Sequence, residues 1–175
     1  MNPPQIFASG AQGLHRMHRV ALIYNPASGQ HPERRAALIT DVVAVLHSAA
    51  IEVEVIPTES AESVGTQAQQ AIRDGCDTIL ACGGDGTVHE VLQGVVGTSA
   101  ALGVIPMGIA NALAADLGLA ASPEKAAKML LAAIPVRVSV GRVCYRDREG
   151  SSRSRFFVVA AGVGADAFFF SRLDP

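Results

Sequence analysis

The chain has 175 residues, 49% of them apolar, with 14 lysines and arginines against 16 aspartates and glutamates. This length allows one domain with a sizeable core but not two full ones, and a formal net charge of −2 gives no signal for nucleic-acid binding. Three cysteines without regular spacing argue against a disulfide framework and a zinc site.

The N-terminal part of the sequence predicts a tail, a strand, a loop and a helix. Residues 1–17 are polar and aperiodic, and they lack the apolar core of a secretory leader, so we expect a loose tail on a cytoplasmic protein. The apolar run Val20–Tyr24 predicts a buried strand that ends in the loop Asn25–Gly29. Apolar residues at helical spacing then predict a helix over Pro32–Ala50.

The second strand-helix unit follows directly. Alternation over Ile51–Ile56 predicts a strand that stops at Pro57–Thr58. Ser60 or Ser63 can cap a helix that continues to about Asp74.

The most distinctive stretch is Gly83-Gly84-Asp85-Gly86-Thr87, between a predicted strand at Asp77–Ala81 and a predicted helix. Its glycines permit positive φ angles and the close approach of a phosphate. Asp85 or Thr87 can cap the helix, whose first N–H groups form an anion site. A tight turn that needs its glycines only for geometry is the alternative. The neighbouring Cys82 is expected to be a buried core thiol.

A fourth strand, Leu102–Ile105, leads into the loop Pro106–Asn111, and helices are predicted over Ala112–Leu117 and Pro123–Ala133. Four alternations of strand and helix predict an α/β fold with a parallel sheet flanked by helices. Because ligands bind at the carboxyl ends of such strands, the four loops that follow the strands are expected to converge on one site.

The pattern changes after Pro135. Val136–Val140 and Arg142–Tyr145 read as β structure, and a polar turn separates them from Phe156–Ala161, as in an antiparallel hairpin. We therefore expect a tail (1–17), an α/β domain (18–134) and the first strands of a truncated β-rich second domain (135–175). Exposed phenylalanines at Phe168–Phe170 would favour association with another copy of the chain, so a homodimer is one expectation.

Two common nucleotide-binding motifs are absent from the sequence. A Walker A loop requires a lysine, and none lies near either glycine-containing loop. A dinucleotide fingerprint would follow the first strand, where Asn25–Gly29 stands instead.

The loops nevertheless resemble one family. Gly83–Thr87 with Glu90 resembles the signature of the diacylglycerol kinase catalytic domain superfamily, which includes bacterial lipid kinases, sphingosine kinases and ceramide kinases. Asn25–Gly29 is similar to its first-strand loop, and Pro106–Asn111 resembles its Pro-x-Gly-Thr-x-Asn loop. NAD kinases share the Gly-Gly-Asp-Gly loop but lack the Asn-Pro-x-Ser-Gly start, which favours the lipid branch.

This resemblance implies ATP-dependent, Mg²⁺-assisted phosphorylation of a lipid hydroxyl, as in diacylglycerol, with peripheral contact at the inner membrane surface and no nucleic-acid partner. The general base is expected beyond Pro175. Asp85 is the one catalytic candidate; it could hold Mg²⁺ through water or cap the turn, and no side chain is assigned as a direct metal ligand. The expected nucleotide-binding residues are Asn25, Ser28, Gly29, Thr58, Gly83, Gly84, Asp85, Gly86, Thr87, Val88, His89, Glu90, Gly108, Ile109 and Asn111.

Three of these residues need comment. The family places a threonine at the position of Thr58, beside the nucleotide. Ile109 replaces the family's threonine, and His89 stands where asparagine is common. Asn111 is expected to bond the loop backbone more than the ligand.

Three functional hypotheses follow. The chain is the nucleotide-binding half of a lipid kinase that needs further residues for activity, or a non-catalytic nucleotide-binding module, or a kinase of a soluble substrate such as NAD.

Overall fold

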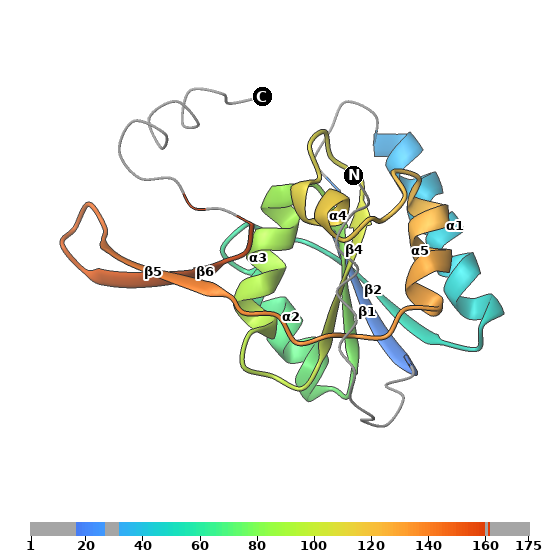
Figure 1. The fold of residues 1–175 in the computed structure, drawn as a ribbon, viewed down its shortest axis with the longest axis horizontal. Coiled ribbons are helices and arrows are strands. Elements are labelled where there is room, and N and C mark those ends of the chain that lie inside the picture. Colours follow the sequence, from blue (N-terminus) through green and yellow to red (C-terminus); the bar gives the residue numbers. More distant parts are fainter. Residues whose placement is uncertain (1–16, 27–31, 160, 162–175) are drawn as a thin grey trace, which may run out of the picture.

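A computed structural model describes residues 17–26, 32–159 and 161 (Figure 1). Residues 1–16 of the predicted tail, the loop residues Ser28 and Gly29, and Phe168–Phe170 lie outside the described residues.

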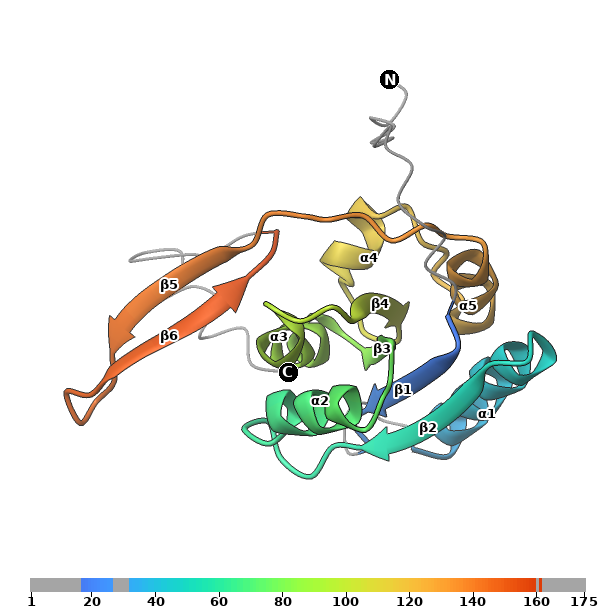
Figure 2. The same ribbon diagram turned by 90° about the horizontal axis from the view of Figure 1, so that it is seen from below.

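The described chain forms a four-stranded parallel sheet of order β2-β1-β3-β4. The strands are β1 (Arg19–Tyr24), β2 (Glu52–Pro57), β3 (Thr78–Gly83) and β4 (Ala101–Pro106). Helices cover both faces, which confirms the predicted α/β fold (Figures 1 and 2). They are α1 (Pro32–Ser48), α2 (Val64–Arg73), α3 (Asp85–Val95), α4 (Ala112–Asp116) and α5 (Pro123–Leu131). None of the helices in the described ranges is both long and apolar enough to cross a membrane.

The side chains of β1 point alternately to the two faces of the sheet, which divides the core in two. Ala21 and Ile23 point to the side covered by α2, α3 and α4, whereas Val20 and Leu22 point to the side covered by α1 and α5. All four side chains are completely buried. A strand covered on both faces must be apolar at every position, which explains why β1 was recognisable as a continuous apolar run.

The two central strands lead the chain in opposite directions. From β1 it moves outward to β2, and from β3 it moves to β4 on the other edge. The carboxyl ends of β1 and β3 therefore flank a topological switch point, where open α/β sheets bind their ligands. Asn25 and the glycine loop follow these two strands.

A two-stranded antiparallel hairpin, β5 (Gly141–Arg146) and β6 (Ser152–Phe157), follows the α/β part. The predicted hairpin is present, but its bounds were wrong. Residues 136–140 are not a strand, because none of the described residues pairs with them. The polar residue Ser152, expected in the turn, instead pairs with Arg146 and begins β6.

Helix ends also differ from prediction. The first helix stops at Ser48 because Ala50 has a left-handed backbone (φ 58°), which turns the chain into β2. Ser63 precedes α2 as expected, but its hydroxyl makes no capping bond to that helix and donates instead to the carbonyl of Ser60 at 3.0 Å. Pro123 occupies the first turn of α5, as predicted.

Helices α2 and α3 approach closely at a pair of glycines, which predicts a strong effect of Gly94→Ala. A Cβ at Gly94 would overlap the carbonyl oxygen of Gly65, which is backbone and cannot move aside. We expect overpacking to cost about 1–3 kcal/mol, despite the higher helix propensity of alanine, and the Tm to fall by several degrees. Thermal unfolding measures the effect.

The matched control is Gly86→Ala on the same helix, since no heavy atom lies within 4 Å of a Cβ there. Equal melting temperatures for the two variants would contradict the packing argument.

Candidate functional site

The parallel sheet brings the predicted loops to one edge, as expected. Thr58, which follows β2, donates its backbone N–H to the carbonyl of Tyr24 at the end of β1, at 2.8 Å. The loop after β4 donates back to the loop after β3, because the N–H of Met107 bonds the carbonyl of Gly83 at 3.0 Å. Backbone hydrogen bonds therefore tie the residue after β2 to the end of β1, and the loop after β4 to the end of β3.

The glycine loop leads directly into α3. Gly84 precedes the helix in an extended conformation, and the first hydrogen bond of the helix runs from the N–H of Val88 to the carbonyl of Gly84. The N–H groups of Asp85, Gly86 and Thr87 precede this bond, so they have no carbonyl partner within the helix. They point out of the helix start, where backbone dipoles favour an anion.

Gly83 and Gly84 serve close packing rather than positive φ angles. Gly83, Gly84 and Gly86 all lack a positive φ, which corrects the conformational part of the prediction. A Cβ on Gly83 would overlap the side chain of Thr87, and one on Gly84 would lie 3.2 Å from the Cα of Gly108. Gly86 differs, because a Cβ there meets nothing within 4 Å. The outer side of the loop is therefore open.

Asp85 joins the two loops instead of capping its own helix. Its Oδ1 accepts a 2.7 Å hydrogen bond from the N–H of Ala112, the first residue of α4. Helix α3 has no side-chain cap, so the prediction that Asp85 or Thr87 caps it was wrong. The carboxylate satisfies one of the unpaired donors at the start of α4. A catalytic role for Asp85 stays a prediction.

Asn111 closes the loop after β4. Its side-chain oxygen accepts from the N–H of Gly108 at 2.9 Å, and its amide nitrogen donates to the Gly108 carbonyl at 2.8 Å. The residue has a left-handed backbone (φ 49°, ψ 49°), which asparagine tolerates better than most residues. Both ends of the amide are occupied by the backbone, as the sequence predicted for this residue.

Ile109, at the apex of this closed loop, is fully exposed, with a relative accessibility of 101%. It therefore makes no contribution to the core, and its side chain is open to solvent beside the glycine loop. Packing in the core therefore does not account for an isoleucine at position 109.

The remaining predicted residues, Val88, His89 and Glu90, lie on α3 beyond the loop. Val88 is 4% exposed and packs in the core against β3. His89 and Glu90 lie close together, with 3.9 Å between Nδ1 and Oε1, and Glu90 forms an ion pair with Arg155 of β6. Val88 therefore faces the core and Glu90 faces the hairpin, whereas His89 is partly exposed beside Glu90.

Sequence reasoning missed Gln93, one helical turn beyond Glu90. Its amide donates to the carbonyl of Phe156 and accepts from the N–H of the same residue, both at 2.9 Å, as a neighbouring strand would. The three-residue spacing of Glu90 and Gln93 marks a common helix face. Only the tertiary structure shows that β6 lies against that face.

Neither a thiol nucleophile nor a metal cluster accompanies the loop. Cys82 is completely buried, and burial raises the pKa of its thiol, so it is neutral at physiological pH. Within the described ranges, no group of three histidines, cysteines or carboxylates could hold a metal ion.

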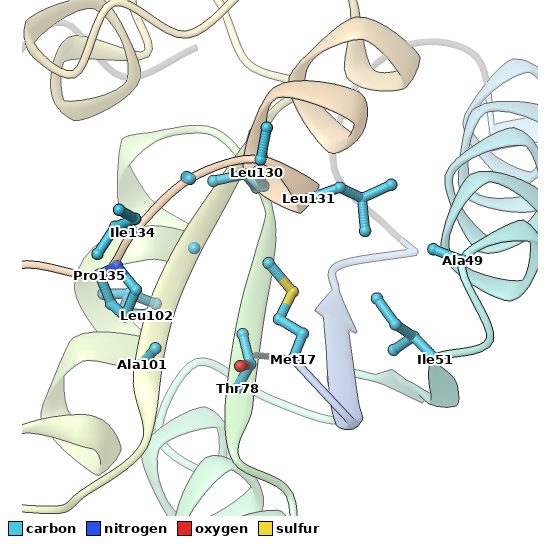
Figure 3. Close-up of a pocket in the computed structure, with 13 residues that line it drawn as sticks. Met17, Ala49, Ile51, Thr78, Ala101, Leu102, Leu130, Leu131, Ile134 and Pro135 are labelled. Carbon is cyan, nitrogen blue, oxygen red and sulfur yellow. The ribbon is translucent and has the colours of Figure 1, made fainter. Parts of the chain in front are cut away.

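A hollow of about 340 Å³ lies at the opposite edge of the sheet (Figure 3). Thr78 and Ala101, the first residues of β3 and β4, line it together with Met17, Ile51 and apolar residues of α5. It is mainly apolar and far from the loops along the strands, so it is not the candidate site.

Comparison with known proteins agrees with the loop motifs. The family model of the diacylglycerol kinase catalytic domain matches residues 19–143. A diacylglycerol kinase of Staphylococcus saprophyticus is 31% identical over 147 residues, which cover 82% of this chain and 45% of that protein. One from Staphylococcus carnosus is 29% identical over 147 residues, 82% of this chain and 44% of that protein.

A solved structure of a diacylglycerol kinase from Bacillus anthracis superposes with a TM-score of 0.58 at 28% identity, covering 66% of this chain and 40% of the other. The chain thus spans less than half the length of the relatives it matches.

The contact between Asp85 and Ala112 predicts different effects for two substitutions of the same residue. Asp85→Ala removes the acceptor, and we expect a loss of about 0.5–2 kcal/mol of unfolding free energy. Asp85→Asn keeps an oxygen acceptor and should lose much less. Urea denaturation measures both, and equal losses would show that the carboxylate charge, not the hydrogen bond, stabilises the loop pair.

Proposed function

The chain belongs to the diacylglycerol kinase catalytic domain family, and we propose that it carries the nucleotide-binding half of an ATP-dependent lipid kinase. The transferred group would be the γ-phosphoryl of ATP, and the acceptor a lipid hydroxyl such as that of diacylglycerol. Residues 18–134 would bind the nucleotide, and residues 135–175 would begin a β-rich part. Contact with the cytoplasmic membrane surface is part of the proposal, and a homodimer stays a prediction.

The open start of α3 carries this proposal. The N–H groups of Asp85, Gly86 and Thr87 have no partners within the helix. No side chain lies within 4 Å of a Cβ built on Gly86, so the space beside these groups is open. A helix start contributes about 0.3–1 kcal/mol toward an anion, and up to about 2 kcal/mol in partly buried geometry. Phosphoryl transfer depends mainly on positioning and charge neutralisation, and a rigid pair of loops suits this requirement.

The residues of the two loops fit the phosphates of ATP better than they fit a metal ion that is bound directly by side chains. Lysine is absent from the loops, since Lys125 and Lys128 both lie on α5. Without a cluster of three ligands in the described ranges, Mg²⁺ would be held mainly by phosphate oxygens and water, with Asp85 as the carboxylate in the loop. When bound, the ion would neutralise charge on the transferred phosphoryl group.

The loop backbone, the Gly84–Gly108 contact and the Asn111 closure would orient the phosphates. Asn25, Ser28, Gly29 and Thr58 would complete the nucleotide contacts at the ends of β1 and β2. Because Val88 faces the core and Glu90 faces the hairpin, any nucleotide contact that these two residues make would come through the backbone or through the hairpin.

Gly86→Val tests this placement of the nucleotide. The branched side chain meets no protein atom near its Cβ, so the fold should persist, but it would occupy the space in front of the loop N–H groups. We expect ATP–Mg²⁺ affinity, measured by calorimetry, to fall at least tenfold, which is about 1.4 kcal/mol. The control is Ala37→Val on the exposed surface of α1, and unchanged affinity in folded Gly86→Val would contradict the placement.

Labelled ATP, Mg²⁺ and diacylglycerol micelles separate a lipid kinase from a nucleotide-binding module when they are added to a version of the chain extended by its downstream coding sequence, since only the kinase then forms phosphatidate. The 175-residue chain alone is expected to form none, and nucleotide binding without phosphatidate in the extended version would favour the module.

Ile109→Thr tests whether the exposed apex of the second loop faces the nucleotide. Threonine restores the hydroxyl of the family pattern, and one hydrogen bond would strengthen ATP binding by about 0.5–1.5 kcal/mol. Because Ile109 is fully exposed, the unfolding free energy should not change. Ile134→Thr, at another exposed isoleucine, is the control. Weaker binding by Ile109→Thr would show that the isoleucine itself contacts the ligand.

A further inference from the structure

The guanidinium group of Arg35 is half-buried and has no partner among the residues that the structure describes. Arg35 lies in the first turn of α1, close after Pro32. Its Nε and Nη1 atoms have almost no access to solvent, and neither donates a hydrogen bond within the described ranges. No described carboxylate forms an ion pair with it. The charge of Arg35 is therefore neither fully hydrated nor neutralised by the described part of the protein.

The other half-buried arginines of the described ranges each have a carboxylate partner. Arg19 pairs with Glu52 at 3.2 Å, and Arg155 pairs with Glu90. Both also have a buried nitrogen without a hydrogen bond, but the ion pair compensates their charge. Because removing an unpaired charge from water is strongly unfavourable, Arg35 requires a negative partner that these contacts do not provide.

The sequence next to α1 contains no suitable counter-charge. Residues 25–31 connect β1 to α1 and read Asn-Pro-Ala-Ser-Gly-Gln-His, without a carboxylate. Residues 1–16 contain neither aspartate nor glutamate. Glu33 is two residues before Arg35, and residues at this spacing on a helix do not face each other. An anion that binds to the protein can supply the missing charge.

Helix geometry directs Arg35 toward the edge formed by the carboxyl ends of the strands, the carboxyl edge. Helix α1 begins at this edge, because it follows the end of β1 and packs back along the sheet (Figure 1). Ile39 and Val42, four and seven residues further on, are buried in the core, so Arg35 shares their inward face. Side chains of an α-helix lean toward its N-terminus, which here means toward the carboxyl edge.

The core on the α1 side is connected to the glycine loop. Tyr24 at the end of β1 and Met107 after β4 both pack against this core, and the N–H of Met107 donates to the carbonyl of Gly83 at 3.0 Å. Helices α1 and α3 cover opposite faces of the sheet. Their first turns therefore flank the switch point between β1 and β3 from two sides.

We propose that Arg35 binds a phosphate group of the nucleotide, across the switch point from the N–H groups at the start of α3. The inference rests on the proposed function, and it assigns a positively charged side chain to a site whose loops contain no lysine. A guanidinium group can donate two parallel hydrogen bonds to a phosphate. The backbone N–H groups would orient the phosphates, and Arg35 would neutralise part of their charge.

Arg35→Gln tests the inference, with Arg34→Gln as the matched control, because Arg34 lies in the same helical turn and is exposed. In calorimetry with ATP–Mg²⁺, Arg35→Gln should bind about tenfold more weakly or worse, since a hydrogen bond to a charged group contributes about 10- to 100-fold. Arg34→Gln should bind nearly as the unmodified chain does. Arg35→Lys keeps the charge without the paired donors and should fall between the two.

Two further measurements separate phosphate binding from a structural role. Adenosine has no phosphate, so in NMR titrations it should bind Arg35→Gln and the unmodified chain equally. Arg35→Met removes the unpaired charge but keeps an apolar stem, so without nucleotide its melting temperature should equal or exceed that of the unmodified chain. A lower melting temperature, or a parallel loss of adenosine binding, would overturn the inference.

The calorimetry also distinguishes this inference from the proposed function. Equal ATP affinities for Arg35→Gln and Arg34→Gln, in a chain that binds ATP, would overturn the inference and leave the proposed function in place. Arg35 would then serve a carboxylate of the protein rather than the nucleotide. Failure of the unmodified chain to bind ATP–Mg²⁺ would overturn both.

Discussion

The candidate site depends on one steric constraint, the contact between the backbones of Gly84 and Gly108. No other residue type fits at this approach, since a Cβ on Gly108 would lie 2.5 Å from the Cα of Gly84. The hydrogen bond from Ala112 to Asp85 and the amide closure by Asn111 hold the same arrangement. Two loops far apart in sequence thereby become one rigid surface, as phosphoryl transfer requires of its binding groups.

Helix α3 connects this surface to the hairpin. Its first residues present unpaired N–H groups beside the loops, while Glu90 and Gln93, one and two turns further on, hold β6. Because a helix is stiff over this length, the position of the hairpin and the direction of the N–H groups are set by the same element. The proposed nucleotide site and the end of the hairpin would therefore keep a constant relation to one another.

The two edges of the sheet have different chemistry. At the carboxyl edge the strands β1, β2 and β3 lead into Asn25, Thr58 and Gly84, which are partly exposed. At the amino edge the hollow of about 340 Å³ is lined mainly by apolar side chains. Parallel strands produce this division, because all of their loops on one edge follow the carboxyl ends and all on the other precede the amino ends.

The sequence by itself determined the sheet and the location of the loops. Buried parallel strands must be apolar throughout, so β1 and β3 were recognisable, and strand-helix alternation implied that their loops converge. It also identified the family through Gly83–Thr87. Only the tertiary structure decided that Asp85 caps α4 rather than α3, that Gln93 binds β6, and that residues 136–140 stay unpaired. These outcomes depend on partners 27 and 63 residues away, or on the lack of one in the described chain, and local periodicity carries no information about contacts at such separations.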